Sequence, residues 1–251
     1  MLVSCIKMIK IDINCDVGEG IGNEESLMPY ISSCNIACGG HSGDADTIHK
    51  VISLAKTHKV NIGAHPSYPD KENFGRKSIQ ITPKELIETI QKQLEYIIKI
   101  AKTHKVTLHH IKPHGALYND VAKNSSIAKS FLKAIEHYKK TLYLFVPYKS
   151  IISEEATKQG FKTKYEAFAD RNYNTDLSLV SRNIPNAVIE NPEDVLQHMV
   201  GMVKNQKVKT VKGSQVKIKA DTYCVHGDTP SALEIVTYLT QELPNYNIEI
   251  Q

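Results

Sequence analysis

Titratable side chains gather in one short stretch of the sequence, HHIKPHGALYND, from residue 109 to residue 120. It holds three histidines, a lysine, a tyrosine and an aspartate around a Pro-His-Gly turn. A structural loop has little need for so many titratable groups, whereas a site that transfers protons or holds a polar substrate requires them. Side chains two residues apart in a strand point to the same side. We therefore expect Lys112 and His114 together in a site, with His109 on the opposite face.

Polar residues also follow other strand-like segments, and six of seven such segments end in a polar cluster. Helix capping explains single polar residues, and Asp44 and Asp228 each precede a helix that they could cap. Capping does not require a cluster at nearly every strand end. In a parallel barrel the carboxyl ends of all strands open on one face, where active sites lie. We expect these side chains on that face: Asp12, Asn14, Asp16 and Glu19; Asn35, His41 and Asp44; His65 and Asp70; His110, Lys112, His114 and Tyr118; Glu166, Asp170 and Arg171; His226 and Asp228.

Strand-like and helix-like segments alternate along the chain. The predicted strands cover residues 7–16, 33–40, 60–67, 106–115, 141–147, 161–170 and 221–228. The predicted helices cover residues 46–59, 82–105, 192–205 and 229–243, and residues 208–220 read as an extended insertion or hairpin. This alternation predicts a parallel sheet with helices outside it. Seven strands favour an incomplete or seven-stranded α/β barrel over an open doubly wound sheet, with residues 1–251 as a single domain.

The loop after the first strand, VGEGIGNEE, contains Gly18, Gly20 and Gly22, which favour irregular backbone. Its G-x-G-x-G spacing differs from the dinucleotide-binding and Walker patterns, and Glu19 would repel a phosphate. The chain also contains no G-x-x-x-x-G-K-[ST] sequence and no kinase-like motif set. We interpret the segment as a flexible active-site loop and expect no classical P-loop ATP site in this chain.

The composition narrows the class of protein. Apolar residues make up 41% and the net charge is +4. No basic run is interleaved with aromatics, so nucleic acid is not an expected partner. No run approaches the roughly 20 apolar residues of a membrane span, and residues 1–10 resemble a lead-in to the first strand, not a secretion signal. The five cysteines form no Cys-x-x-Cys pair, and several lie in apolar runs, where a thiol behaves as a buried hydrophobe. This usage suits a reducing cytoplasm.

Six blocks of sequence together resemble the LamB/YcsF family: DINCDVGEG, NIACGGHSGD, GAHPSYPD with FGR, KPHGALYND, FADRNY and CVHGDTPSAL. They run in order from Asp12 to Leu233. The chain departs from the family pattern at Gly40, where an aromatic or apolar residue is expected, at Ser42, where alanine is expected, and at Lys77, where a second arginine is usual. The resemblance implies a seven-stranded, TIM-like barrel related to the glycoside hydrolase/deacetylase superfamily. It also implies ATP-driven opening of 5-oxo-L-proline to L-glutamate, carried out with partner subunits B and C.

For that reaction we expect five catalytic residues, namely Asp16, His65, Lys112, His114 and Asp170. His114 or His65 would act as general base for water, and Asp16 and Asp170 would orient these imidazoles. Lys112 together with Arg76 or Arg171 would hold the carboxylate or a phosphate. Contacts with the substrate are expected from Asp12, Asn14, Glu19, Asn35, His41, Arg76, Tyr118, Arg171 and His226. ATP would be used by the complex, and a homo-oligomer is compatible with the sequence.

Two other functions stay open at this point. Related deacetylases hold a metal between histidines and carboxylates, and Asp12, Asp16, His41, His65 and His114 could supply such ligands for a stand-alone metal-dependent amide hydrolase or deacetylase. No H-x-x-x-H or H-E-x-x-H pattern lies on a predicted helix, since His110 and His114 fall in the predicted strand at residues 106–115, so no firm metal is expected. A non-catalytic subunit that only binds and delivers the substrate is the third interpretation.

Overall fold

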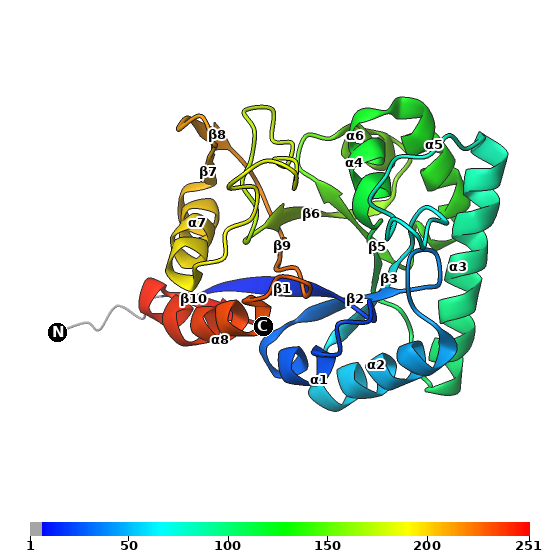
Figure 1. Ribbon diagram of the computed structural model, residues 1–251, viewed down its shortest axis with the longest axis horizontal. Coiled ribbons are helices and arrows are strands. Elements are labelled where there is room, and N and C mark those ends of the chain that lie inside the picture. The colour runs from blue at the N-terminus through cyan, green and yellow to red at the C-terminus, as the bar shows by residue number, and fades with distance from the viewer. Residues whose placement is uncertain (1–6) are drawn as a thin grey trace.

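The computed structural model describes residues 7–251, and its centre is a closed barrel of seven parallel strands (Figure 1). The strands are β1 (Ile9–Val17), β2 (Ser33–Ala37), β3 (Asn61–His65), β4 (His110–Ile111), β5 (Tyr143–Pro147), β6 (Lys162–Phe168) and β9 (Thr222–Cys224). Each pairs in parallel with the next, and β9 pairs with β1 to close the ring. The predicted seven-stranded barrel is therefore confirmed. Residues 1–6, with Cys5 and the start of the expected lead-in, lie outside the described residues.

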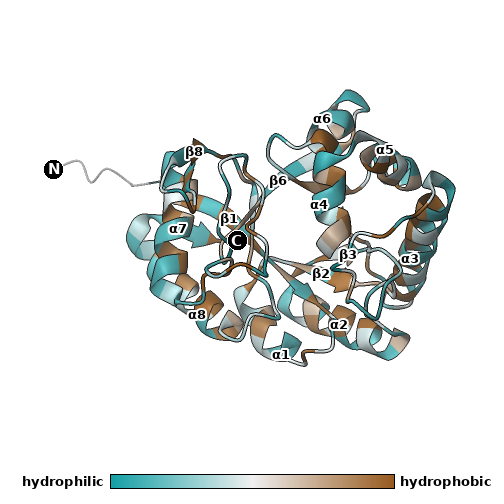
Figure 2. Ribbon diagram, turned by 45° about the horizontal axis from the view of Figure 1, so that its top comes forward, coloured by the Kyte–Doolittle hydropathy of each residue, from teal (hydrophilic) through white to brown (hydrophobic). Residues whose placement is uncertain are grey.

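Helices surround the barrel, and most follow a strand (Figure 1). They are α1 (Glu24–Leu27), α2 (Ala45–His58), α3 (Pro83–Thr103), α4 (Gly115–Lys123), α5 (Ser125–Ala134), α6 (Ile151–Lys158), α7 (Pro192–Asn205) and α8 (Ala232–Glu242), with 3-10 turns at Met28–Tyr30, Glu136–Tyr138 and Leu243–Tyr246. Figure 2 shows that these helices carry both hydrophobic and hydrophilic residues. In α3, Leu86, Ile90 and Leu94 are buried at helical spacing, so one face of this helix packs on the barrel.

Two elements extend the barrel. The strand β10 (Ile248–Ile250) pairs in parallel with the first residues of β1, and it was not predicted. The strands β7 (Lys207–Lys209) and β8 (Gln215–Lys217) form an antiparallel hairpin, which confirms the extended insertion expected at residues 208–220. No helix among residues 7–251 is long and apolar enough to cross a membrane.

The strand β4 is much shorter than the predicted strand at residues 106–115. Pro113 has no amide hydrogen to donate, and His114 is already the N-cap residue of α4. Backbone pairing with β3 nevertheless continues beyond β4, since the His109 amide donates to the Ile62 carbonyl (2.7 Å) and the Lys112 amide to the Ala64 carbonyl (2.9 Å). The stretch is thus extended up to the point where its lysine and histidine face the barrel mouth.

Caps fix the ends of the helices that follow the strands. Asp44 accepts a hydrogen bond from the Thr47 amide and caps α2, which confirms its capping role. Thr82 and Glu85 form a reciprocal capping box at the start of α3. Asp228 does not cap α8, whose N-cap residue is Ser231, so the capping explanation offered for Asp228 is wrong.

The departure from the family pattern at Gly40 has a local packing reason. A Cβ at Gly40 would lie 2.3 Å from Oε1 of the Gln93 side chain and 2.4 Å from Oγ of Ser67. Gln93 accepts from the Ser67 amide (3.0 Å) and donates to the Ser67 carbonyl (2.8 Å). Any larger residue at position 40 would displace this buried amide, which joins α3 to the loop after β3.

Candidate active site

A cavity of about 470 Å³ opens at the carboxyl ends of the barrel strands. Its walls come from the loops after β1, β3, β4, β6 and β9. Nine of the site residues expected from sequence line it, namely Asp16, Glu19, His65, Arg76, Lys112, His114, Tyr118, Arg171 and His226. Five do not, namely Asp12, Asn14, Asn35, His41 and Asp170. The shared strand-end face therefore brings together most of the expected residues.

Lys112 lies at the centre of the cavity floor, with 2% of its surface exposed. Its Nζ is 2.9 Å from Oδ1 of Asp16 and 2.9 Å from Oε1 of Glu166. It also donates to Oδ1 of Asn14 (3.2 Å) and lies 3.1 Å from Sγ of Cys224. Burial lowers the pKa of Lys112, but the Asp16 carboxylate and the neighbouring anionic groups raise it well above its ordinary value overall. The ammonium stays charged and already faces two carboxylates.

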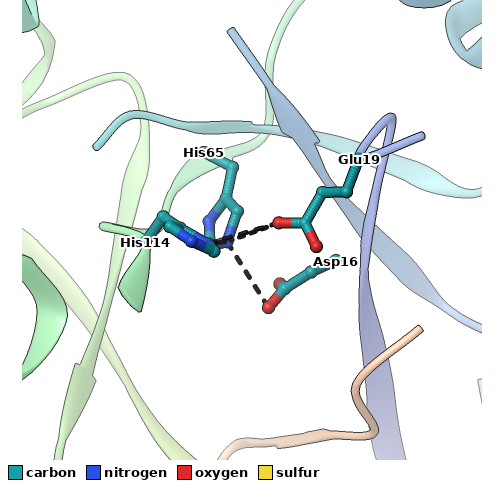
Figure 3. A group of neighbouring side chains, drawn as sticks. All are labelled: Asp16, Glu19, His65 and His114. Carbon is teal, nitrogen blue, oxygen red and sulfur yellow. Dashed lines mark hydrogen bonds and ion pairs between the residues drawn. The ribbon is translucent and has the colours of Figure 1, made fainter. Parts of the chain in front are cut away.

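His65 and His114 form a facing pair beside the lysine (Figure 3). Nδ1 of His65 lies 2.8 Å from the Lys112 carbonyl, and Nε2 of His114 lies 2.9 Å from the Phe74 carbonyl. A carbonyl can only accept, so each of these ring nitrogens carries the hydrogen. The opposite nitrogens, Nε2 of His65 and Nδ1 of His114, are 3.0 Å apart. In two neutral rings both of these nitrogens are acceptors.

Two carboxylates converge on the same point (Figure 3). Oε1 of Glu19 is 3.2 Å from Nδ1 of His114 and 3.8 Å from Nε2 of His65, and Oδ2 of Asp16 is 3.4 Å from Nε2 of His65. Burial raises the pKa of Glu19, but its hydrogen bond to His114 is among the contacts that bring it below the ordinary value. Burial lowers the pKa of His114, and Glu19 opposes that shift. Four acceptor atoms thus surround one point, which requires a shared proton or a bound cation there.

The same four residues fit the chemistry of a metal site. The ligand atoms of Asp16, Glu19, His65 and His114 all lie within 4.8 Å of one another. Two imidazoles and two carboxylates suit a divalent transition metal such as Zn²⁺, and the backbone carbonyls that hold the two rings are typical outer partners of such ligands. His41 is not in this set, because its ring stacks on His114 with 3.6 Å between centroids and its Nε2 lies 3.0 Å from Glu19. Glu19 takes the place expected for His41.

The asparagines of the first two strands lie beneath the floor. Asn35 is fully buried and donates to Oδ1 of Asn14 (2.7 Å) and to Oδ1 of Asp16 (2.7 Å). Oδ1 of Asn35 lies 2.6 Å from Nε2 of the buried His110. Asp12 lies one step further down the barrel, where Ser33 Oγ donates to it (2.6 Å). These residues orient Asp16 or fill the barrel beneath the floor and do not line the cavity, so the contacts with substrate expected of Asp12, Asn14 and Asn35 have no support in the geometry.

Asp170 serves a different imidazole from the one expected. Its carboxylate is fully buried and accepts from Nδ1 of His226 (2.9 Å), from the His226 amide (2.9 Å) and from Oγ1 of Thr229 (3.2 Å). Burial raises the pKa of Asp170, but the His226 contacts bring it below the ordinary value. The expectation that Asp170 orients His65 or His114 is therefore not met, because His226 stands between Asp170 and the cavity.

The remaining expected residues lie on the walls and rim. Tyr118 is buried, and burial followed by the Glu166 charge raises its pKa well above the ordinary value. Arg171 donates from Nε to the Ala187 carbonyl (3.1 Å) and from Nη2 to the Val180 carbonyl (2.6 Å), so it holds the loop after β6.

Among the residues around Lys112, three received no role from the sequence. Glu166 and Cys224 contact Lys112, and the ring of Phe168 lies 5.4 Å from its Nζ. Glu166 and Phe168 lie four and two positions before Asp170. Residues two apart in a strand point to the same side, so this spacing could have placed both side chains with Asp170 on one face. Cys224 gave no signal, because a thiol in an apolar strand reads as a core residue.

Comparison with known proteins agrees over nearly the whole chain. The model of the LamB/YcsF family matches residues 11–251. The A subunit of 5-oxoprolinase from Pyrococcus abyssi is 40% identical over 247 residues, which are 96% of this chain and 97% of that protein. The protein of the same name from Staphylococcus haemolyticus is 41% identical over 248 residues, 97% of this chain and 99% of that protein. The crystal structure of the lactam utilization protein from Thermus thermophilus superposes with a TM-score of 0.90 at 33% identity, over 97% of this chain and 99% of that one. The chain belongs to the LamB/YcsF family.

Proposed function

We propose that this chain is the A subunit of an ATP-dependent 5-oxoprolinase, which opens the lactam of 5-oxo-L-proline to give L-glutamate. Relatives of about 40% identity over nearly the full length are named as the A subunit of 5-oxoprolinase. Family membership supports the reaction class, and the cavity supplies side chains suited to it. The partner subunits B and C, the use of ATP and a cytoplasmic location belong to this proposal; the four buried free thiols of residues 7–251 suit a reducing compartment.

One observation supports the proposal most, namely the His65–His114 pair beside the Lys112–Asp16 pair. Hydrolysis of an amide requires a base that takes a proton from water and an acid that protonates the leaving nitrogen. The two facing acceptor nitrogens of His65 and His114 can take up one proton from water and later give it to the leaving nitrogen. The carboxylates of Asp16 and Glu19 stabilise the imidazolium that exists between these two transfers.

ATP enters this proposal through the partner subunits. A lactam is a stable amide, and phosphorylation of its oxygen would make the ring carbon electrophilic. The glycine-rich loop after β1 contains Glu19, whose negative charge would repel a phosphate, and the chain has no Walker sequence. We therefore assign nucleotide binding to the partners and ring opening to the cavity of this chain.

The test is a coupled assay of glutamate formed from 5-oxo-L-proline and ATP. The proposal expects glutamate only when this chain and both partner subunits are present. Glutamate formation at the full rate by the two partners without this chain would contradict it.

A second function is favoured by the four convergent acceptors, Asp16, Glu19, His65 and His114. A divalent metal held by them would lower the pKa of a bound water and polarise a carbonyl. In that case the chain alone would hydrolyse an amide without ATP. Elemental analysis of protein purified without a chelator or a nickel column separates the two functions, since a stoichiometric metal supports only the second.

A further inference from the structure

All three arginines of the chain lie at the cavity described above. The sequence contains 31 lysines and arginines, of which only Arg76, Arg171 and Arg182 are arginine. Arg76 lies in the loop after β3, and Arg171 and Arg182 lie in the loop after β6. Each of them lines the same cavity. Because a lysine supplies the positive charge nearly everywhere else, the use of arginine here indicates a need for its planar fork of donors.

Two of these arginines face each other across one carboxylate at the rim. Arg76 comes from the loop after β3 and forms an ion pair with Asp228, which follows β9. Arg182 comes from the loop after β6, and its two terminal nitrogens lie 3.3 and 3.5 Å from the oxygens of the same carboxylate. Arg171 supports this arrangement, because it binds the carbonyl of Val180 two residues before Arg182.

The rim pair keeps donors for a ligand. A guanidinium has five N–H donors, and within residues 7–251 Asp228 is the one carboxylate paired with Arg76 or Arg182. The side chains are 41% and 30% exposed, respectively, whereas Asp228 is 14% exposed. The carboxylate therefore fixes the two guanidiniums in place but neutralises only one of them.

The charges of the cavity are unevenly distributed between floor and rim. At the floor, Lys112 faces Asp16 and Glu166, and Glu19 adds a third carboxylate. At the rim, the two guanidiniums of Arg76 and Arg182 share the single carboxylate of Asp228. A small anion is thus repelled from the floor and attracted to the rim. This polarity argues against Lys112 as the group that binds a substrate carboxylate.

We propose that Arg76 and Arg182 form the subsite for the carboxylate of the substrate, and that they orient its lactam towards the histidine pair at the floor. This assignment rests on the proposed function. Asp228 is a positioning residue, which holds both forks ready for a bidentate contact. A substrate bound in this way places its charged group at the mouth and its neutral amide beside His65 and His114.

The test compares the acid with its neutral analogue in the assembled complex. Steady-state kinetics are measured with 5-oxo-L-proline and with its primary carboxamide, for the native chain and for Arg182→Gln. The KM for the acid should rise roughly 10- to 100-fold, as for the loss of a charge-assisted contact, while the KM for the carboxamide stays within about twofold. Lys212→Gln, which removes an exposed positive charge on the β7–β8 turn, should leave both values unchanged.

Two outcomes would overturn the proposal. The first is an Arg182→Gln chain that keeps the native KM for the acid while the complex remains active. The second is a rise in the KM for ATP without a rise for the acid, because the arginine pair would then bind phosphate. Calorimetric binding of 5-oxo-L-proline to the isolated chain decides the question if the complex shows no activity, and a native-like affinity in Arg182→Gln would again contradict the proposal. Arg182→Lys should recover part of the affinity, since it restores the charge without the fork.

Discussion

The lysine at the cavity floor shows how tightly the charges of this site depend on one another. Lys112 is buried between Asp16 and Glu166 at 2.9 Å from each. A buried ion pair adds little net stability as a whole, but removing one member leaves an uncompensated charge in a low dielectric. The pKa of Asp16 lies well below its ordinary value, because contacts with His65 and Lys112 outweigh the effect of burial. The carboxylate at the floor therefore stays ionised only as part of this set.

Lys112→Met should abolish glutamate formation and lower the free energy of unfolding by about 3–5 kcal/mol, because two carboxylates would then face each other unpaired. Chemical denaturation and the coupled assay measure the two effects. The double variant Lys112→Met/Glu166→Gln removes one of the two charges and should regain part of the stability without regaining activity. Native stability in the single variant would show that the three charges are not coupled.

At the scale of residues, the sequence predicted positions better than partners. Asp16, His65, Lys112 and His114 were found because strand ends of a parallel barrel share one face and a period of two selects one side of each strand. The pairing of Lys112 with Glu166 joins β4 to β6 across the barrel, and no local pattern encodes such a contact. Glu19, and not His41, belongs to the four convergent residues, because the ring of His41 stacks on His114. Loop sequences do not reveal such stacking. The roles assigned to these residues remain predictions.

At the scale of the elements, Gly63 sets how closely β3 and β4 pack beneath the cavity floor. A Cβ on Gly63 in β3 would lie 2.1 Å from Nε2 of His110 in β4. That imidazole contacts Asn35, which in turn donates to Asp16. The glycine therefore allows β3 and β4 to bring the buried polar chain up to the carboxylate at the floor.

Gly63→Ala should destabilise the protein by about 1–3 kcal/mol, as for overpacking of a core, and should also lower activity through Asp16. Thermal unfolding and the coupled assay provide the readouts. Gly201→Ala in α7 is the matched control, since a Cβ there meets nothing closer than 3.6 Å and alanine favours a helix by up to about 1 kcal/mol. An unchanged melting temperature in Gly63→Ala would refute the close contact.

Asp170 joins the ends of β6 and β9 and gives the stability a pH dependence of known sign. Its pKa is lowered in the fold, so its contribution is present above the unfolded value of about 3.9 and is lost as the pH falls through the folded value. Asp170→Asn should therefore cost about 1.5–3 kcal/mol at neutral pH, and the difference from the native chain should shrink below about pH 4. Denaturation curves across that range measure it, and a difference that grows in acid would contradict the assignment.

Element boundaries were the least predictable part of the fold. The alternation of strand and helix patterns was sufficient for the barrel, because parallel strands require crossover helices. The helices α5 and α6 and the strand β10 were not predicted; they are 10, 8 and 3 residues long, and patterns of that length are weak. β4 ended early because Pro113 and the start of α4 interrupt it.

At the scale of the whole molecule, the four convergent acceptors require either a proton or a metal ion, and we favour a shared proton. Protein purified without a chelator should then contain less than one equivalent of metal. Pre-treatment of this chain with EDTA, which is removed before the Mg²⁺ salt of ATP is added, should leave glutamate formation by the complex unchanged. Elemental analysis by mass spectrometry gives the content. A stoichiometric metal whose removal stops the reaction would favour the metal-dependent hydrolase instead.

We propose that the cavity of this chain performs the ring opening within a complex that consumes ATP. The most direct measurement follows glutamate and ADP together in the assembled complex, with the native chain, with His114→Gln and with the exposed His58→Gln as control. The native and control complexes should form both products in parallel, and His114→Gln should slow glutamate formation by about 10²- to 10⁴-fold, the usual loss for a general base. Glutamate formation at the native rate in the His114→Gln complex would contradict the claim.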